Sequence, residues 1–148
     1  GEEAFAADNR KVDDTGVMAD KDFIGFDSVH TNGGTTGTNA ILTFRYKKNG
    51  QTQQTKIATL QTMVASTWYK VGFLYDPSAD TTKRIKCFLN GAEQTTYVTG
   101  TNIAAATFPD AEEIGPVFIN KAGAGTAGHL YLDWACVGQY CDDANATG

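Results

Sequence analysis

The stretch "TWYKVGFLYDPSADTTKRIKCFLNG", residues 67–91, decides the fold class of this chain. Tyr69, Val71 and Phe73 occupy alternate positions, which places them on one face of an extended strand. The stretch ends in Asn-Gly, a pair that accepts the positive φ angles of a type I′ hairpin turn. It therefore predicts two antiparallel strands around an acidic loop, with the face of Tyr69, Val71 and Phe73 directed at the core.

The same alternation recurs along most of the chain, and Gly, Asn and Pro separate the alternating segments. In residues 40–47, Leu42, Phe44 and Tyr46 share one face. A further Asn-Gly pair at 49–50 predicts a second type I′ turn. The predicted strands cover residues 22–29, 40–47, 52–62, 67–76, 84–91, 93–99, 115–121 and 129–139.

Strands at this turn-punctuated spacing predict an all-β fold, namely an antiparallel β-sandwich of the jelly-roll type. Helical signals are weak, and residues 102–113 are expected either to hold a short helical turn or to cross the sandwich. The 148 residues suit a single domain over 1–148, in which 141–148 form a polar tail.

Composition and charge exclude several classes of protein. The chain is 41% hydrophobic and 20% charged, as a globular domain is, and no apolar run approaches the roughly 20 residues of a membrane helix. The net charge is −5, and the basic residues form no cluster larger than a pair. We therefore expect neither a membrane nor a nucleic acid as partner.

The three cysteines, Cys87, Cys136 and Cys141, are too few and odd in number for a disulfide framework. Cys136 and Cys141 leave two interpretations open. They form a bridge across "CVGQYC", or all three are reduced and mostly buried thiols.

Signals for catalysis are missing, so no catalytic residue is expected and the chain is predicted not to be an enzyme. Glycoside hydrolysis needs two nearby carboxylates, and no Glu-x-Asp-x-x-Glu pattern occurs. The only histidines are His30 and His129, and there is no Gly-x-Ser-x-Gly turn for a nucleophilic serine. Zinc is not expected either, because strand alternation puts His129 and Cys136 on opposite faces.

A calcium site is one interpretation of the loop after residue 75. Asp76, Ser78 and Asp80 place oxygen ligands at alternate positions, as calcium loops do. Cys87, however, stands where an EF-hand has its bidentate glutamate. The other interpretation is a plain turn in which Pro77 fixes φ and aspartate caps the backbone. No cofactor other than this calcium is expected.

Sugar binding by stacking would use exposed aromatic side chains. His129, Tyr131 and Asp133 alternate along a predicted strand and would present polar and aromatic groups on one face. Trp68 leads another predicted strand and is a further candidate for carbohydrate contact. Trp134 falls on the opposite face of its strand, in line with leucines, and is expected in the core.

Several of these segments resemble a known family. "STWYKVGFLYDP", the strand that ends "FLNG", and "LDWACVGQ" are similar to the concanavalin-A-like, laminin-G-like jelly roll. More narrowly, "MADKDFIGF" and "TNIAAATFPD" resemble structural proteins of tailed-bacteriophage virions, of the head-decoration type. The resemblance covers most of residues 18–140. It transfers no functional residue, because neither the glucanase carboxylates nor the lectin metal ligands of the fold map onto this chain.

The resemblance implies a structural component of a viral particle, located on the capsid or another exposed virion surface. Its partners would be other virion proteins or copies of itself, and a front strand before "GEEAFAADN" would be missing or supplied by a neighbour. The alternative is a lectin-like module that binds a host-surface glycan, with or without calcium, and is otherwise extracellular. A hydrolase is the third hypothesis.

Overall fold

The computed structural model describes residues 21–29, 40–64, 66–109, 116, 118 and 131–138. The chain divides into two compact units, Gly1–Ile114 and Gly115–Gly148. All the described strands belong to the first unit. The elements are β1 (Phe23–Val29), β2 (Ile41–Lys47), β3 (Gln54–Thr62), β4 (Val71–Tyr75), β5 (Ile85–Leu89), β6 (Ala92–Glu93) and the short helix α1 (Gly100–Ile103).

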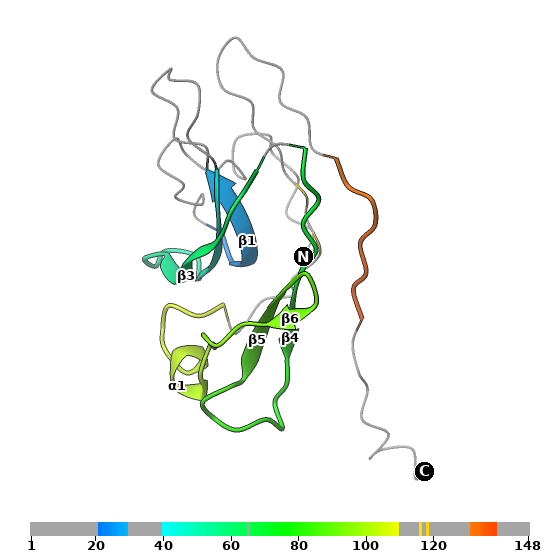
Figure 1. Ribbon diagram of the computed structural model, residues 1–148. Helices are drawn as coiled ribbons and strands as arrows, with labels where there is room; N and C mark the ends of the chain where they lie inside the picture. The colour runs from blue at the N-terminus through cyan, green and yellow to red at the C-terminus, as the bar shows by residue number, and fades with distance from the viewer. Residues whose placement is uncertain are drawn as a thin grey trace, which may run out of the picture. The chain divides into compact units, whose positions relative to one another are not determined.

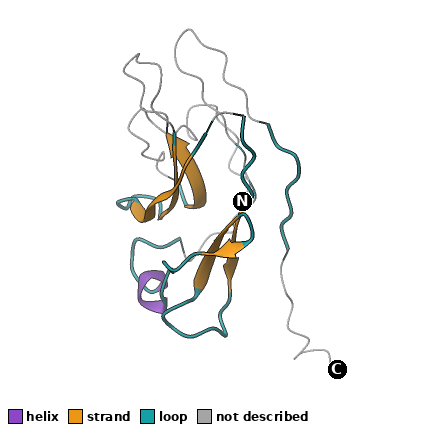
Figure 2. Cartoon of the chain, viewed as in Figure 1, coloured by secondary structure: helices purple, strands orange, loops and turns teal. Residues whose placement is uncertain are grey.

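The strands form two antiparallel sheets, one with the order β1-β2-β3 and one with the order β4-β5-β6 (Figure 1). Within the described ranges, the only helix is the four-residue α1 (Figure 2). The predicted all-β class is therefore confirmed at this level. That the strands complete a jelly roll, and that 1–148 is one domain, stay predictions.

Strand β2 confirms the alternation predicted for it. Leu42, Phe44 and Tyr46 are 7%, 0% and 3% exposed. The other face of β2 is covered as well, since Thr43 and Lys47 are buried. The sequence pattern identified which side chains share a face, but it did not show that both faces are covered.

The core of the first unit draws on both sheets. Phe44 and Tyr46 of β2 cluster with Ile85 and Cys87 of β5 and with Val98. The neighbouring apolar side chains that pack against this cluster are Ile24, Phe26, Ile57, Ile103 and Phe108. Burial raises the pKa of the Cys87 thiol to about 12, so this thiol is protonated and inert at neutral pH.

The two Asn-Gly pairs form different turns. Asn90 and Gly91 have φ angles of 51° and 84°, and Leu89 pairs with Ala92, so this is the predicted two-residue type I′ hairpin. At the other pair, Gly50 alone has a positive φ, 73°. The amide of Gln51 donates to the carbonyl of Lys48, which fits a type II turn instead, within a longer loop between β2 and β3.

The predicted strands at the C-terminal end differ from the structure. Residues 131–138 contain no strand, and their side chains are exposed, including Trp134, which is 58% exposed and not in the core. The predicted strand 93–99 is reduced to the end of β6 and a single bridge between Val98 and Ile85. Among the described helical residues, none belongs to a helix long and apolar enough to cross a membrane.

Candidate functional site

Strand β4 carries its apolar side chains on the face that also forms the core. Phe73 pairs with Cys87 and Tyr75 pairs with Ile85, so these side chains share a face with two of the most buried residues. The ring of Phe73 lies 5.6 Å from that of Phe44 and 6.2 Å from that of Phe26, measured between centroids. The prediction that this face is directed at the core is therefore confirmed for Phe73.

The same side chains are nevertheless far from buried. Val71, Phe73 and Tyr75 are 38%, 42% and 54% exposed, and Leu74 on the opposite face is 41% exposed. Within the described ranges β4 is the last strand of its sheet, because it pairs with β5 on one side only. A strand at this position lacks the neighbour that would cover its outer side.

The backbone hydrogen bonds define which groups of β4 face outward. The amide of Asn90 donates to the carbonyl of Lys70, and that of Asp76 donates to the carbonyl of Arg84. Antiparallel pairs alternate between bonded and non-bonded positions, so the even-numbered residues of this strand bond to β5. The N–H and C=O groups of Val71, Phe73 and Tyr75 therefore point to the outer edge. We call these three residues the β4 edge.

Opposite charges stand at the two ends of the β4 edge. Lys70 precedes the strand, and its backbone amide donates a hydrogen bond to Asn90 Oδ1 at 2.9 Å. Asp76 follows the strand, and its Oδ1 accepts hydrogen bonds from the Ser78 hydroxyl and from the amides of Ser78 and Ala79. These bonds, the hydroxyl bond first, lower the pKa of Asp76, so its carboxylate is charged at neutral pH.

The predicted calcium ligands each serve a local turn. Asp76 Oδ1 is engaged by Ser78 and Ala79, while Asp80 Oδ1 accepts from the hydroxyl and the amide of Thr82 at 2.7 and 2.8 Å. The Thr82 hydroxyl is the main cause that lowers the pKa of Asp80. Among the described residues, no group of three His, Cys, Asp or Glu gathers where a metal could bind. The capped turn accounts for the observed bonds, and calcium stays a prediction.

The candidate sugar-binding residues fall in different parts of the chain. Trp68 belongs to the first unit and is 68% exposed. Tyr131, 74% exposed, and Asp133, also exposed, belong to the second unit, and His129 lies outside the described residues. These four residues are therefore described in two separate units or lie outside the described residues. Their role in glycan binding stays a prediction.

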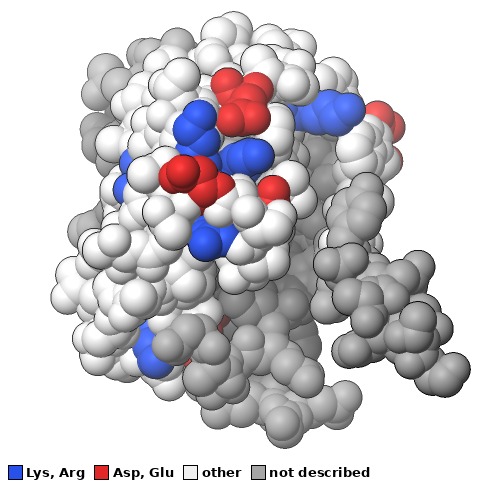
Figure 3. Space-filling view, turned by 90° about the horizontal axis from the view of Figure 1, so that it is seen from below, with Lys and Arg blue, Asp and Glu red and all other residues white. Residues whose placement is uncertain are grey.

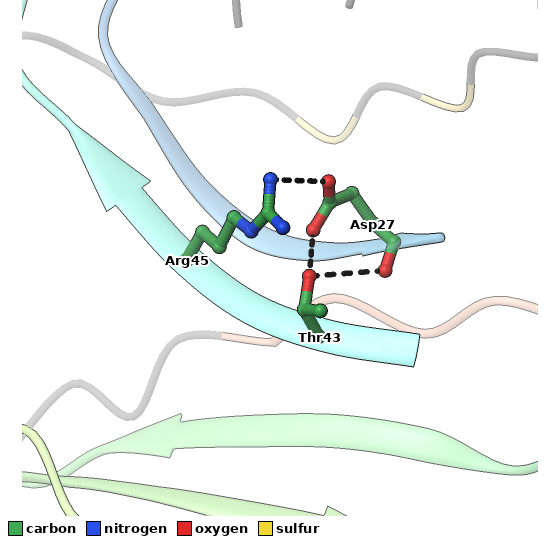
Figure 4. Close-up of polar contacts among 3 residues, drawn as sticks. All are labelled: Asp27, Thr43 and Arg45. Carbon is green, nitrogen blue, oxygen red and sulfur yellow. Dashed lines mark hydrogen bonds and ion pairs between the residues drawn. The ribbon is translucent and has the colours of Figure 1, made fainter. Parts of the chain in front are cut away.

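A polar cluster on β1 and β2 was not anticipated from the sequence. Arg45 Nη1 lies 3.2 Å from Asp27 Oδ2, and the Thr43 hydroxyl donates to Asp27 Oδ1 and to the Asp27 carbonyl (Figure 4). The side chains of Asp27 and Arg45 are only 8% and 16% exposed. Asp27 pairs with Thr43, while Gly25, which has no side chain, stands opposite Arg45. A charged residue inside the mostly apolar "FIGFDSV" was the available signal.

Burial dominates the electrostatics of this cluster. It raises the pKa of Asp27, although the hydrogen bond from Thr43 and the charge of Arg45 both act to lower it. A single carboxylate in an ion pair provides neither the second carboxylate of glycoside hydrolysis nor a nucleophile beside a base. The arrangement is that of a buried, mutually compensating charge pair.

Blue and red side chains are interspersed over the face that Figure 3 shows, and no area of one sign dominates this face. Cys136 is a free and exposed thiol, contrary to the expected burial, and Cys141 lies outside the described residues.

Comparison of the chain with protein-family models, with curated proteins and with solved structures finds no match. The resemblance to jelly-roll virion proteins stays a prediction from the sequence.

Proposed function

We propose that this chain is a non-enzymatic structural domain that acts by docking on other protein chains. The observation that carries the proposal is the β4 edge, whose apolar side chains are 38–54% exposed on the face that elsewhere forms the core. Soluble domains usually protect such a strand with charge, proline or a bulge. An unprotected edge is instead typical of a surface that another strand covers.

The setting proposed for this docking is a viral particle, with the chain on the capsid or another exposed surface. Support comes from the resemblance of its strand segments to virion structural proteins. A repeating protein shell suits a small contact, because many copies bound together hold firmly even where each contact is weak. The net charge of −5 would help to keep such a decorated particle soluble.

The test is the composition of purified virus particles from the source that carries this sequence. Particles are separated by density, and the chain is quantified by mass spectrometry against the major shell protein. We expect a fixed copy number per particle that survives high-salt washing. Absence from the particles, or a copy number that washing reduces to background, contradicts the proposal.

A second candidate is a lectin-like module, favoured by the exposure of Trp68 and Tyr131. Exposed aromatic rings are the surfaces on which sugars stack. A glycan array with the purified chain, with and without a calcium chelator, separates this function from the first. Binding that is lost on replacing Trp68 with alanine would support the lectin, and calcium-dependent binding would also implicate Asp76 and Asp80. We expect no binding above background.

A further inference from the structure

We propose that the β4 edge pairs with the same edge of a second copy of this chain, in antiparallel orientation about a two-fold axis at Phe73. The inference deepens the proposed function, since it names the partner of the same surface and the register of the contact. It rests on three properties of β4 that are independent of one another. These are its outward backbone groups, its side-chain pattern and its terminal charges.

The backbone of β4 is ready to accept another strand. The N–H and C=O groups of Val71, Phe73 and Tyr75 point away from β5, because the neighbouring even-numbered residues make the bonds to it. None of the hydrogen bonds among the described residues engages these outward groups. A second β4 placed antiparallel with Phe73 opposite Phe73 satisfies all of them, since each residue of the β4 edge then meets a bonding position.

The side chains match in this register. Phe73 stands opposite its own copy, and Val71 stands opposite Tyr75 of the other chain, both on the core-side face. Aromatic pairs and pairs of an aromatic with a β-branched side chain are among the favourable cross-strand combinations. Pairing would also cover side chains that are 38–54% exposed in the single chain.

The charges at the ends of β4 select the antiparallel orientation. With Phe73 at the centre, Lys70 of one copy lies opposite Asp76 of the other, and the same contact repeats at the far end because the pairing is symmetric. Opposite charges directly across a strand pair stabilise it, whereas like charges destabilise it. A parallel pairing in register would instead place Lys70 beside Lys70 and Asp76 beside Asp76.

Strand β4 also lacks three of the usual protections of a free edge. Val71–Tyr75 contains no proline and no charged residue, and its pairing with β5 runs without a bulge. The strand is short, so a contact through this edge alone belongs to the weak class of interfaces. The resulting dimer is expected to dissociate on dilution.

The first experiment is sedimentation equilibrium of the whole chain over a wide concentration range. Wild type is expected to convert from monomer to dimer, and Lys70→Glu to weaken the dimer roughly tenfold, because glutamate then faces Asp76 at both ends. Lys83→Glu, an equal charge change at an exposed residue outside β4, is the matched control and is expected to leave the dimer unchanged. A chain that stays monomeric at all concentrations overturns the inference and shows that the edge is covered by another partner or by the same chain.

The second experiment tests the register by mixing two variants. Lys70→Glu repels itself, Asp76→Lys repels itself, but a mixed pair restores opposite charges at both ends. We therefore expect Lys70→Glu and Asp76→Lys to form a heterodimer when mixed, while each remains mostly monomeric alone. Circular dichroism of each variant confirms that it is folded. Wild-type dimerisation without rescue in the mixture of folded variants overturns the register, and with it the inference.

The two proposals can fail separately. If the chain is a monomer in solution but is present in virus particles at a fixed copy number, the pairing of β4 edges is refuted and the structural function stands. If the chain dimerises but is absent from the particles, the pairing of β4 edges stands and the virion function is refuted.

Discussion

Strands β2 and β4 have similar sequence patterns but opposite environments. In β2 the alternating apolar face is 0–7% exposed, and the polar residues behind it, Thr43 and Lys47, are buried as well. In β4 the alternating face is 38–54% exposed, and Leu74 behind it is 41% exposed. The strands differ in position, since β2 is central in its sheet and β4 is terminal among the described strands. Alternation defines which side chains share a face, but it does not show how far that face is covered.

The largest effect expected from this comparison is on the stability of two phenylalanine variants. Phe44→Ala removes a ring that is 0% exposed and is expected to cost about 3–5 kcal/mol of the free energy of unfolding. Phe73→Ala removes a ring that is 42% exposed and should cost only about 1–2 kcal/mol in the monomer. Urea unfolding at low protein concentration measures both values. Equal losses would contradict the contrast between the two strands.

The buried charge pair of the first sheet is expected to come next in magnitude. Arg45→Met keeps the side-chain length but leaves Asp27 buried without its cation, which is expected to cost about 3 kcal/mol. Combining it with Asp27→Leu removes both charges and should recover most of this loss. Urea unfolding of the single and double variants provides the comparison. A double variant no more stable than Arg45→Met would contradict this expectation, because removing the unpaired charge would then recover nothing.

The two Asn-Gly turns supply a smaller and matched test. Asn90→Ala forces alanine to a φ of 51° and removes the hydrogen bond to the Lys70 amide, so a loss of about 1–2 kcal/mol is expected. Asn49→Ala occupies a negative φ and should change stability by less than about 0.5 kcal/mol. Thermal unfolding of both variants measures the difference. A loss at Asn49 as large as at Asn90 would mean that both turns are of type I′.

The smallest expected effect is a pH dependence with two opposite signs. The pKa of Asp27 is raised in the folded state, so its contribution to stability is present below the ordinary aspartate pKa and is lost as the pH rises through the raised value. The pKa values of Asp76 and Asp80 are lowered, so their contribution is present above the ordinary pKa and is lost as the pH falls through the lowered values.

Urea unfolding of wild type between about pH 2 and 7 resolves these contributions. With Asp27→Asn, the free energy of unfolding is expected to decrease less as the pH rises above the ordinary aspartate pKa. With Asp76→Asn or Asp80→Asn, the free energy of unfolding should decrease less as the pH falls below the ordinary aspartate pKa. If Asp27→Asn alters only the acid side, then burial does not dominate its pKa.

The sequence predicted the local features of the fold because they depend on near neighbours. Alternation at Leu42, Phe44 and Tyr46 identified the buried face of β2, and Asn90-Gly91 identified a type I′ hairpin. The same dipeptide at 49–50 formed another turn, since the longer loop there imposes no two-residue connection. Local chemistry therefore suffices where a turn joins strands directly.

Features that depend on distant pairing were not predicted. The contact of Asp27 with Arg45 requires the register of β1 against β2, which a glycine-rich segment separates in the sequence. The exposure of Val71, Phe73 and Tyr75 depends on which parts of the chain pack around β4, and alternation does not contain that information. Residues 131–138 alternate as a strand would, but the structure forms no strand there.

The most direct test of the central contrast is residue-resolved amide hydrogen exchange at low and at high protein concentration. In the dilute monomer, the amides of Gly72 and Leu74 should be protected by β5, while those of Val71, Phe73 and Tyr75 exchange quickly. At high concentration these three amides should become protected, whereas the amides of β2 are protected under both conditions. Uniform protection along β4 in the dilute monomer would contradict an open edge, and fast exchange at high concentration would contradict pairing between copies.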